Sequence, residues 1–332
     1  MRPFDKPALS VDQQLELLKK RGLRIANEHK AMCLLEVVTL FRLSPYMRPF
    51  QETRPDHAFK PGSALKDIVE VYRFDSSLRS LVMEAIERVE VAVRAAINNH
   101  LSPRLGSSWI TDPKSFHSSY AHGELLRPLR LKLADEARKL KRELTRNQRS
   151  GRSEHAIRQH MDNRARDNYF RFYGATYNDP ELPPAWAMLE EMSLGTVSTL
   201  FRAIARSRDK KAIASRFKLP FEVLESWLHT LTFIRNCCAH HSRLWNRELP
   251  VRPALPKSWT IAKACQNQPQ PSQRLYVVLT MLAYLTDLIS PDAQWKARAL
   301  KLLGDQDASR LKPMGFPNGW AAQEHWAEIH LG

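Results

Sequence analysis

Cations, imidazoles and amides are concentrated in one short stretch of the chain, between residues 235 and 247. The side chains with chemical potential are Arg235, Asn236, His240, His241 and Arg243. A histidine exchanges a proton near neutral pH, and a guanidinium group holds a phosphate through paired hydrogen bonds. Such groups together can transfer a proton and stabilise charge that develops on phosphorus. The stretch is therefore suited to metal-independent RNA cleavage, in which the substrate's own 2′-hydroxyl attacks the adjacent phosphate.

A long amphipathic helix is predicted to position this stretch, running from Phe221 to about Ser242. Its apolar stripe has the helical spacing, and consists of Leu224, Trp227, Leu228, Leu231 and Ile234. Arg235 continues the stripe, and a guanidinium group that enters a core needs a partner. Glu190, at the edge of the preceding apolar stripe, is the candidate partner.

The same helical spacing places the other polar side chains on a second face. Asn236, His240 and Arg243 stand at i, i+4 and i+7. At 100° per residue, Arg235 lies about 140° from His240. His240 would transfer the proton, Asn236 would orient it, and the arginines would hold the phosphate. A structural alternative stays open, in which Arg235 pairs with Glu190 and His240 caps the helix end.

Two other kinds of chemistry are disfavoured at this stretch. Cys237, Cys238, His240 and His241 are possible zinc ligands, but ligands in five consecutive residues cannot surround one tetrahedral ion. One helix also cannot place a thiol and an imidazole in attack geometry beside an oxyanion hole. We expect no metal and no cofactor.

A second arginine and histidine pair, Arg94 and His100, has a similar spacing. Arg94 stands four residues after Glu90, so the two form a simple ion pair on the charged face of their helix. His100 falls on the apolar stripe about 120° away. We expect a structural role for this pair.

The middle of the chain is strongly basic. Residues 126–172 contain fourteen Lys or Arg and six Asp or Glu, which is half of the whole chain's net charge of +16. Two polar helices joined by a loop near residues 147–151 are expected here. The predicted RNA-binding side chains are Arg138, Lys139, Lys141, Arg142, Arg146, Arg149 and Arg152. The nearby rings of Tyr169, Phe170, Phe172 and Tyr173 could stack on bases, although a run of charges is often only a solvated face.

Composition sets the broad class. The chain has 332 residues, 43% hydrophobic content and a pI near 9.9, which indicates a globular protein with a polyanionic partner. The four cysteines show no disulfide pattern, and the most apolar segment, 275–285, is shorter than the roughly 20 residues of a membrane span. The chain opens without the apolar run of a signal peptide. We expect a cytoplasmic protein without a membrane partner.

The hydrophobic periodicity is helical throughout, so the predicted fold class is all-α. The first expected helix begins at the Ser10 capping box. A second is expected from about 28 to 41, followed by a break at Ser44 and Pro45. Further helices are expected at 75–101, 183–204, 221–242 and 275–289. The predicted domains are an N-terminal helical region at 1–115, a basic helical segment at 116–180 and a helical bundle at 181–332. One continuous fold is the alternative.

The string from Arg235 to Asn246 resembles the hallmark of the Abi-like abortive-infection family (AbiD/AbiF type), and Arg235 with His240 resembles the motif of HEPN-domain ribonucleases. Other strings similar to the family are Lys6-Pro7, Leu18–Gly22, Phe41–Tyr46, Tyr72–Asp75, Leu78-Arg79, Ile86–Glu90, Arg94, Pro183–Trp186, Glu190, Ser193 and Gly195. The sequence departs from the family pattern at Pro45, where glycine is common, and in its longer basic segment.

The resemblance implies a HEPN-type helical bundle that acts as an endoribonuclease in phage defence, often as a toxin. Arg235 and His240 would be the catalytic pair, Asn236 their polar neighbour, and His241, Arg243 and Glu190 supporting residues. The family also implies a homodimer that pairs two motifs, and in some members a regulatory noncoding RNA. The alternatives are a noncatalytic RNA-binding protein on the same fold, and nucleotide or small-ligand chemistry.

Overall fold

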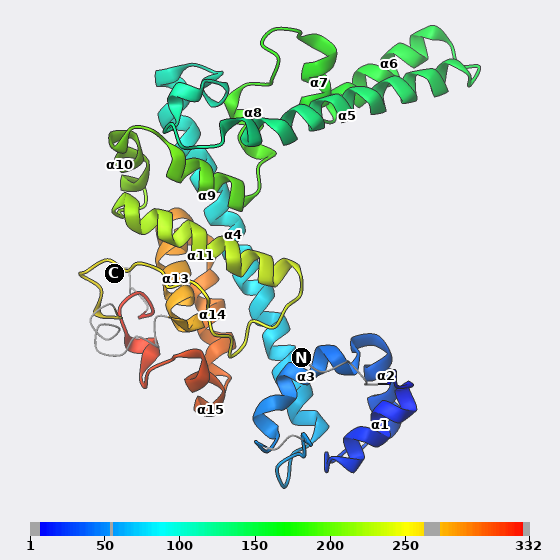
Figure 1. Ribbon diagram of the computed structural model, residues 1–332, viewed down its shortest axis with the longest axis vertical. Coiled ribbons are helices and arrows are strands. Elements are labelled where there is room, and N and C mark those ends of the chain that lie inside the picture. Colours follow the sequence, from blue (N-terminus) through cyan, green and yellow to red (C-terminus); the bar gives the residue numbers. More distant parts are fainter. Residues whose placement is uncertain (1–6, 54–55, 262–272, 328–332) are drawn as a thin grey trace.

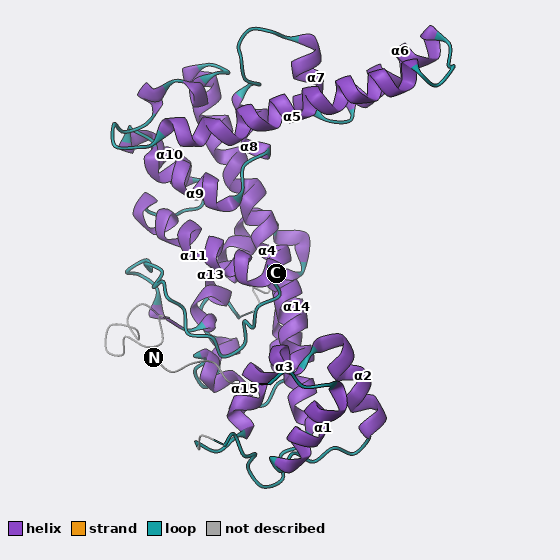
Figure 2. Ribbon diagram, turned by 45° about the vertical axis from the view of Figure 1, so that its right-hand side comes forward, coloured by secondary structure: helices purple, strands orange, loops and turns teal. Residues whose placement is uncertain are grey.

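The computed structural model describes residues 7–53, 56–261 and 273–327. These residues form helices and turns, with three isolated β-bridges and no strand, so the all-α prediction is confirmed. The long helix α4 (Leu65–Leu105) runs along most of the molecule (Figure 1). A small lobe lies at its N-terminal end, and a projecting arm extends from the region of its C-terminal end (Figures 1 and 2).

The lobe contains the first three helices of the chain, which are α1 (Val11–Lys20), α2 (Glu28–Val38) and α3 (Leu40–Met47). The predicted Ser10 capping box is present at the start of α1. One helix was expected from 28 to 41, but Thr39 has a φ of 69° and separates α2 from α3. After this break the Phe41 side chain faces away from the core, and it is 89% exposed.

The expected break at Ser44 and Pro45 was also wrong, because Pro45 lies inside α3. A proline inside a helix leaves the carbonyl four residues earlier without its usual donor. Here that carbonyl belongs to Phe41, and the Ser44 hydroxyl donates to it at 2.9 Å. The local hydrogen bond replaces the missing one, so the helix continues to Met47.

The arm is built from three helices, α5 (His122–Gln148), α6 (Glu154–Arg166) and α7 (Tyr169–Thr176). The predicted pair of polar helices around residues 147–151 corresponds to α5 and α6. Helix α7 packs against both of them. The charged residues of this arm therefore lie on helices that extend away from the bundle (Figure 1).

The bundle packs around α4 and consists of short and long helices from the second half of the chain. Its members are α8 (Ala185–Glu190), α9 (Leu194–Ala203), α10 (Ser207–Ser215), α11 (Phe221–Ala239), α13 (Leu275–Ile289), α14 (Trp295–Gly304) and α15 (Ala308–Leu311). The single helix expected over 183–204 is two, because Ser193 caps a new helix through the amide of Thr196. The prediction for 275–289 matches α13.

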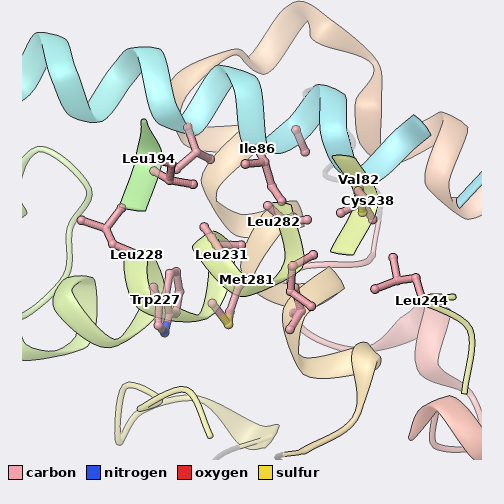
Figure 3. Packing of buried hydrophobic residues seen from close by; sticks show 14 of the residues in the cluster. Val82, Ile86, Leu194, Trp227, Leu228, Leu231, Cys238, Leu244, Met281 and Leu282 are labelled. Atoms are coloured by element: carbon pink, nitrogen blue, oxygen red, sulfur yellow. The ribbon is translucent and has the colours of Figure 1, made fainter. Parts of the chain in front are cut away.

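The core of the bundle lies between α4, α11 and α13. Buried residues of these three helices belong to one cluster, in which Figure 3 shows Leu231 of α11 near Ile86 of α4 and Leu282 of α13. Because α11 is fixed along its whole apolar stripe, its C-terminal end has a defined position. Trp326, near the end of the described residues, is also fully buried.

A candidate active site at the end of helix α11

Helix α11 ends earlier than the sequence suggests. The last helical residue is Ala239, and His240 is the C-cap. The amide of Ser242 donates to the Cys237 carbonyl at 2.8 Å, and the amide of His241 donates to the Cys238 carbonyl at 2.9 Å. This pair of bonds is the Schellman pattern that closes many helices.

His241 stands at the position of that pattern that usually holds glycine. Its φ is 54°, which lies in the left-handed region that a side chain with a Cβ seldom adopts. The Arg42 guanidinium group donates to the His241 carbonyl at 2.7 Å and holds the turn from outside. Such strained backbone persists only where its surroundings fix it, and it is concentrated at functional sites.

A buried carboxylate anchors the chain after this turn. Asp75 of α4 is fully buried and accepts from the amide of Leu244 at 3.1 Å and from the amide of Trp245 at 2.6 Å. Arg79 and the Tyr46 hydroxyl also donate to it. Segments that are far apart in sequence, from α3, α4 and the 240–247 loop, therefore meet at one carboxylate.

The electrostatics of this network keep its members in fixed roles. Burial raises the pKa of the Asp75 carboxyl, while Tyr46, Arg79 and the two loop amides lower it. Burial and the adjacent Asp75 raise the pKa of the Tyr46 hydroxyl, so that Tyr46 stays protonated and remains a donor. The network is thus a fully hydrogen-bonded anchor for the loop rather than a reactive centre.

Arg235, Asn236 and His240 lie beside this anchor. Arg235 is half-buried, and Asn236 and His240 are exposed. Within the described residues, no hydrogen bond or ion pair is formed by the side chains of Arg235 and His240. The backbone of residues 241–245 is therefore held by hydrogen bonds, while the side chains of Arg235 and His240 have no partner among the described residues.

Two predicted relationships at the site were wrong. Glu190 pairs with Arg94, at 3.2 Å, rather than with Arg235, because Arg94 projects from α4 against which α8 packs. Arg94 also forms the expected ion pair with Glu90. Glu190 thus pairs with an arginine of α4. The expected structural role of Arg94 is confirmed.

Arg243 was expected on one helical face with Asn236 and His240. Because α11 ends at Ala239, Arg243 leaves that face and donates to the Pro45 carbonyl at 3.1 Å. Burial, and then the charge of Arg48, lower the pKa of Arg243. Arg243 is therefore one of the contacts that join the loop to α3.

The two cysteines of the stretch are part of the apolar interior. Cys237 and Cys238 are both buried. Burial raises the pKa of both thiols, and that of Cys238 reaches about 12. A thiol that stays protonated is neither a good nucleophile nor a metal ligand. Cys238 packs with the core residues, as Figure 3 shows.

The predicted RNA-binding side chains fall into two groups. Lys139 pairs with Asp135 at 2.7 Å and with Glu136 at 3.0 Å, Arg138 lies 3.5 Å from Asp135, and Arg152 donates to Asn147. The second group is exposed and has no ion pair within the described part of the arm. It consists of Lys141, Arg142, Arg146 and Arg149.

The sequence pattern contains one indication of the Asp75 anchor that the residue types of the 235–247 stretch do not give. Asp75 precedes Leu78 and Val82 at helical spacing, which puts a carboxylate on the buried stripe of α4. A buried carboxylate requires donors. Its donors, Tyr46 and the amides of Leu244 and Trp245, come from segments that no local pattern connects with it.

The fold and this site define an all-α protein in which one buried carboxylate fixes the chain that follows one helix end, beside the polar side chains of Arg235 and His240. A family model described as Abi-like protein matches residues 33–246, which is more than half of the chain. The chain belongs to the family of Abi-like proteins. No curated protein and no solved structure gave a significant match.

Among the described residues, none of the helices combines the length and the apolar character that a membrane crossing requires.

Proposed function

We propose that this protein is a metal-independent endoribonuclease of an abortive-infection defence system. The observation that carries the proposal is the contrast at the end of α11. The backbone of residues 240–245 is fixed by Asp75 and Arg42, while the side chains of Arg235 and His240 have no protein partner among the described residues. Unpartnered polar side chains on a fixed backbone are available to contact substrate.

In the proposed reaction, the 2′-hydroxyl of one nucleotide attacks the phosphorus atom of the next linkage. His240 exchanges a proton with an oxygen of the reacting linkage, either the attacking 2′-oxygen or the departing 5′-oxygen. The new P–O2′ bond forms and the P–O5′ bond breaks, which yields a 2′,3′-cyclic phosphate and a 5′-hydroxyl. Arg235 stabilises the negative charge on the phosphorane, and Asn236 orients the imidazole.

A second copy of the chain would complete the site. His240 and Arg235 leave α11 in different directions on the helical wheel, so a partner's Arg235 and His240 could face them across a two-fold axis. We therefore propose a homodimer with two motifs at one cleft. His241 and Arg243 support the site by shaping the turn, as the contacts with Arg42 and Pro45 indicate.

The basic arm is proposed to hold the RNA strand. Lys141, Arg142, Arg146 and Arg149 leave exposed positive charge that no acidic side chain in the described part of the arm neutralises. Phosphate contacts from such side chains supply affinity without sequence preference. Either the substrate or a regulatory noncoding RNA could occupy this surface.

The test is cleavage of a mixed-sequence RNA by purified protein in EDTA. We expect cleavage, with products that end in a cyclic phosphate, and a loss of about a hundredfold or more on His240→Ala or Arg235→Ala. His29→Ala, an exposed histidine on α2, is the matched control and should cleave like the parent protein. Absence of cleavage, or equal cleavage by His240→Ala, would contradict the proposal.

A second function is favoured by the same exposed arm, namely RNA binding without cleavage. Under that alternative, Arg142→Glu with Arg146→Glu would abolish RNA binding, while Arg235→Ala would leave the cellular phenotype of the protein unchanged. Comparison of the two variants in phage-challenged cells separates the two functions, because only an enzyme needs Arg235.

A further inference from the structure

A cavity of about 570 Å³ lies in the N-terminal lobe between α1 and α3. Its volume falls within the roughly 300–1,000 Å³ of typical small-ligand sites. The polar and aromatic side chains that define its character are Gln14, Arg21, Phe41, Arg48, Gln51 and His57. The cavity is separate from the end of α11 and is not used by the proposed cleavage reaction.

The charged side chains that line this cavity are basic. Arg21, Arg48 and His57 line it, and none of the described residues that line it is an aspartate or a glutamate. Within the described residues, the side chains of these three groups form no ion pair and no hydrogen bond. Guanidinium groups without a carboxylate partner, gathered around one space, are suited to a phosphate.

The other wall can recognise a base. Phe41 is 89% exposed although it belongs to a helix whose remaining apolar residues are largely buried. An exposed ring beside phosphate-binding cations is a platform on which a base can stack. The Gln14 amide donates to the Leu9 carbonyl at 3.0 Å, and its buried oxygen has no partner among the residues that the structure describes. A donor group on a base edge would satisfy that oxygen.

We propose that this cavity binds a nucleoside phosphate, with the phosphate held by Arg21, Arg48 and His57 and the base placed against Phe41. The ligand would be either a free nucleotide or the phosphorylated end of an RNA strand. Helix α3, which forms one wall, also carries Arg42 and Pro45, the two contacts of the 241–243 turn. A ligand in the cavity would therefore lie against α3, the helix whose Arg42 and Pro45 contact the turn after α11.

The experiment is calorimetric titration of the full-length protein with AMP, ATP, inorganic phosphate and short RNAs with a 5′-phosphate or a 5′-hydroxyl. AMP should bind at one site per chain and more tightly than inorganic phosphate. Arg21→Ala and Arg48→Ala should each weaken AMP binding about tenfold or more, since one hydrogen bond to a charged group contributes about that factor. Phe41→Ala should weaken AMP binding but leave phosphate binding unchanged.

Matched controls come from the same lobe. Arg24→Ala and Val37→Ala remove an exposed cation and an exposed apolar side chain outside the cavity, and both should bind AMP like the parent protein. Arg48→Lys, which keeps the charge but loses the paired donors, should show an intermediate affinity even if Arg48→Ala misfolds. Competition between AMP and the 5′-phosphorylated RNA assigns the site to an RNA end, and exclusive binding of AMP or ATP assigns it to a free nucleotide.

Three results would overturn the proposal, namely no AMP binding, equal affinity for AMP and inorganic phosphate, or unchanged AMP affinity in Arg21→Ala and Arg48→Ala. Binding is measured without cleavage. If the protein binds AMP but does not cleave RNA, this inference stands and the ribonuclease proposal fails. If it cleaves RNA but does not bind AMP, the ribonuclease proposal stands and this inference fails.

Discussion

At the residue scale, the contacts of Asp75 determine where the candidate site lies. One carboxylate accepts hydrogen bonds from two amides of the 240–247 loop and from Tyr46, and it pairs with Arg79. Removing it leaves a guanidinium group and several donors buried without partners. The loss of one member of a buried pair costs more than the pair itself contributes.

We expect Asp75→Ala to lower the free energy of unfolding by about 3–5 kcal/mol, the usual cost of breaking a buried ion pair from one side. Tyr46→Phe removes the hydrogen bond that the hydroxyl donates to Asp75 and the one that it accepts from Arg79, and it should cost about 1–2 kcal/mol. Urea unfolding followed by circular dichroism measures both values. Tyr72→Phe is the control, because the neighbouring Tyr72 ring packs against Tyr46 and its hydroxyl has no partner within the described residues. A cost for Asp75→Ala below that of Tyr46→Phe would contradict the anchor role.

The described cysteines differ in burial, and we therefore expect them to differ in reactivity. Cys33 is exposed on α2, whereas burial raises the pKa of Cys237 and Cys238. Because the thiolate is the reactive form, native protein treated with iodoacetamide at pH 8 should be alkylated at Cys33 and spared at Cys237 and Cys238. Peptide mass spectrometry quantifies the three sites, with urea-unfolded protein as the control in which all three react. Rapid native alkylation of Cys238 would show that the end of α11 opens.

The site residues differed in how far residue chemistry could identify them. Arg235, Asn236 and His240 were identified from their types and spacing, and their roles in catalysis stay a prediction. The pairing of Glu190 with Arg235 and the helical face of Arg243 were predicted from helical geometry, and both predictions were wrong. Helix α11 stops at Ala239, and Arg94 reaches Glu190 from another helix.

At the scale of elements, ion pairs connect the three helices of the arm, in addition to the buried apolar side chains of α5 and α7. Glu136 of α5 is buried and pairs with Arg171 of α7 at 2.7 Å. Glu143 of α5 pairs with Arg164 at 3.0 Å and lies 2.9 Å from His160, both on α6. These two carboxylates therefore connect all three helices of the arm.

We expect Glu136→Gln to loosen α7 without unfolding the bundle, because Arg171 loses a charged partner inside the arm. Hydrogen exchange of peptides from residues 154–177 should become faster, while peptides from α11 and α13 stay protected. Glu124→Gln is the control, since Glu124 pairs with Arg127 on an exposed face. Equal exchange in Glu136→Gln and in the parent protein would contradict the role of this pair.

The same pairs predict how the arm responds to acid. Burial raises the pKa of Glu136, but Lys139 and Arg171 outweigh it, so that the net pKa lies below its ordinary value of 4.5. His160 and Arg164 likewise lower the pKa of Glu143, against the effect of burial. For an acid with a lowered pKa, the stabilisation is present above the ordinary pKa and is lost as the pH falls through the lowered one. The exchange protection of α6 and α7 should therefore decrease below about pH 4.5, and protection that rises on acidification would contradict it.

Helix boundaries show what local patterns can and cannot establish. The capping box at Ser10 and the apolar run of α13 were predicted from neighbouring residues alone, and the structure agrees. The breaks near Thr39 and Glu191 were missed. At each break a hydroxyl side chain caps the following helix, Thr39 through the amide of Arg42 and Ser193 through the amide of Thr196. The apolar periodicity does not contain these caps.

At the scale of the whole molecule, positive charge is distributed unevenly. Half of the net charge of +16 belongs to residues 126–172, and the exposed cations of that segment lie on an arm that projects from the bundle (Figures 1 and 2). An extended charged arm can follow a nucleic-acid backbone over several phosphates.

We expect RNA affinity to fall steeply with salt, and the logarithm of affinity to change linearly with the logarithm of salt concentration. Arg142→Glu with Arg146→Glu should weaken binding and reduce the magnitude of that slope by about 1 to 2, since each phosphate contact contributes about 0.7 to 0.9. Fluorescence anisotropy over a salt series measures the slope. Lys301→Glu with Lys312→Glu changes the net charge equally at exposed positions of the bundle, and equal effects of the two double variants would show that the arm is not the binding surface.

The sequence by itself determined the fold class, the helix that carries the candidate site, the basic segment and the resemblance to the Abi-like family, because periodicity, charge and local motifs are properties of neighbouring residues. The tertiary structure decided which side chains are free. It showed that Asp75 fixes the loop after α11, that Arg94 occupies Glu190, and that Arg21, Arg48 and His57 surround one cavity. Such contacts join residues tens to hundreds of positions apart, and only the packed chain brings them together.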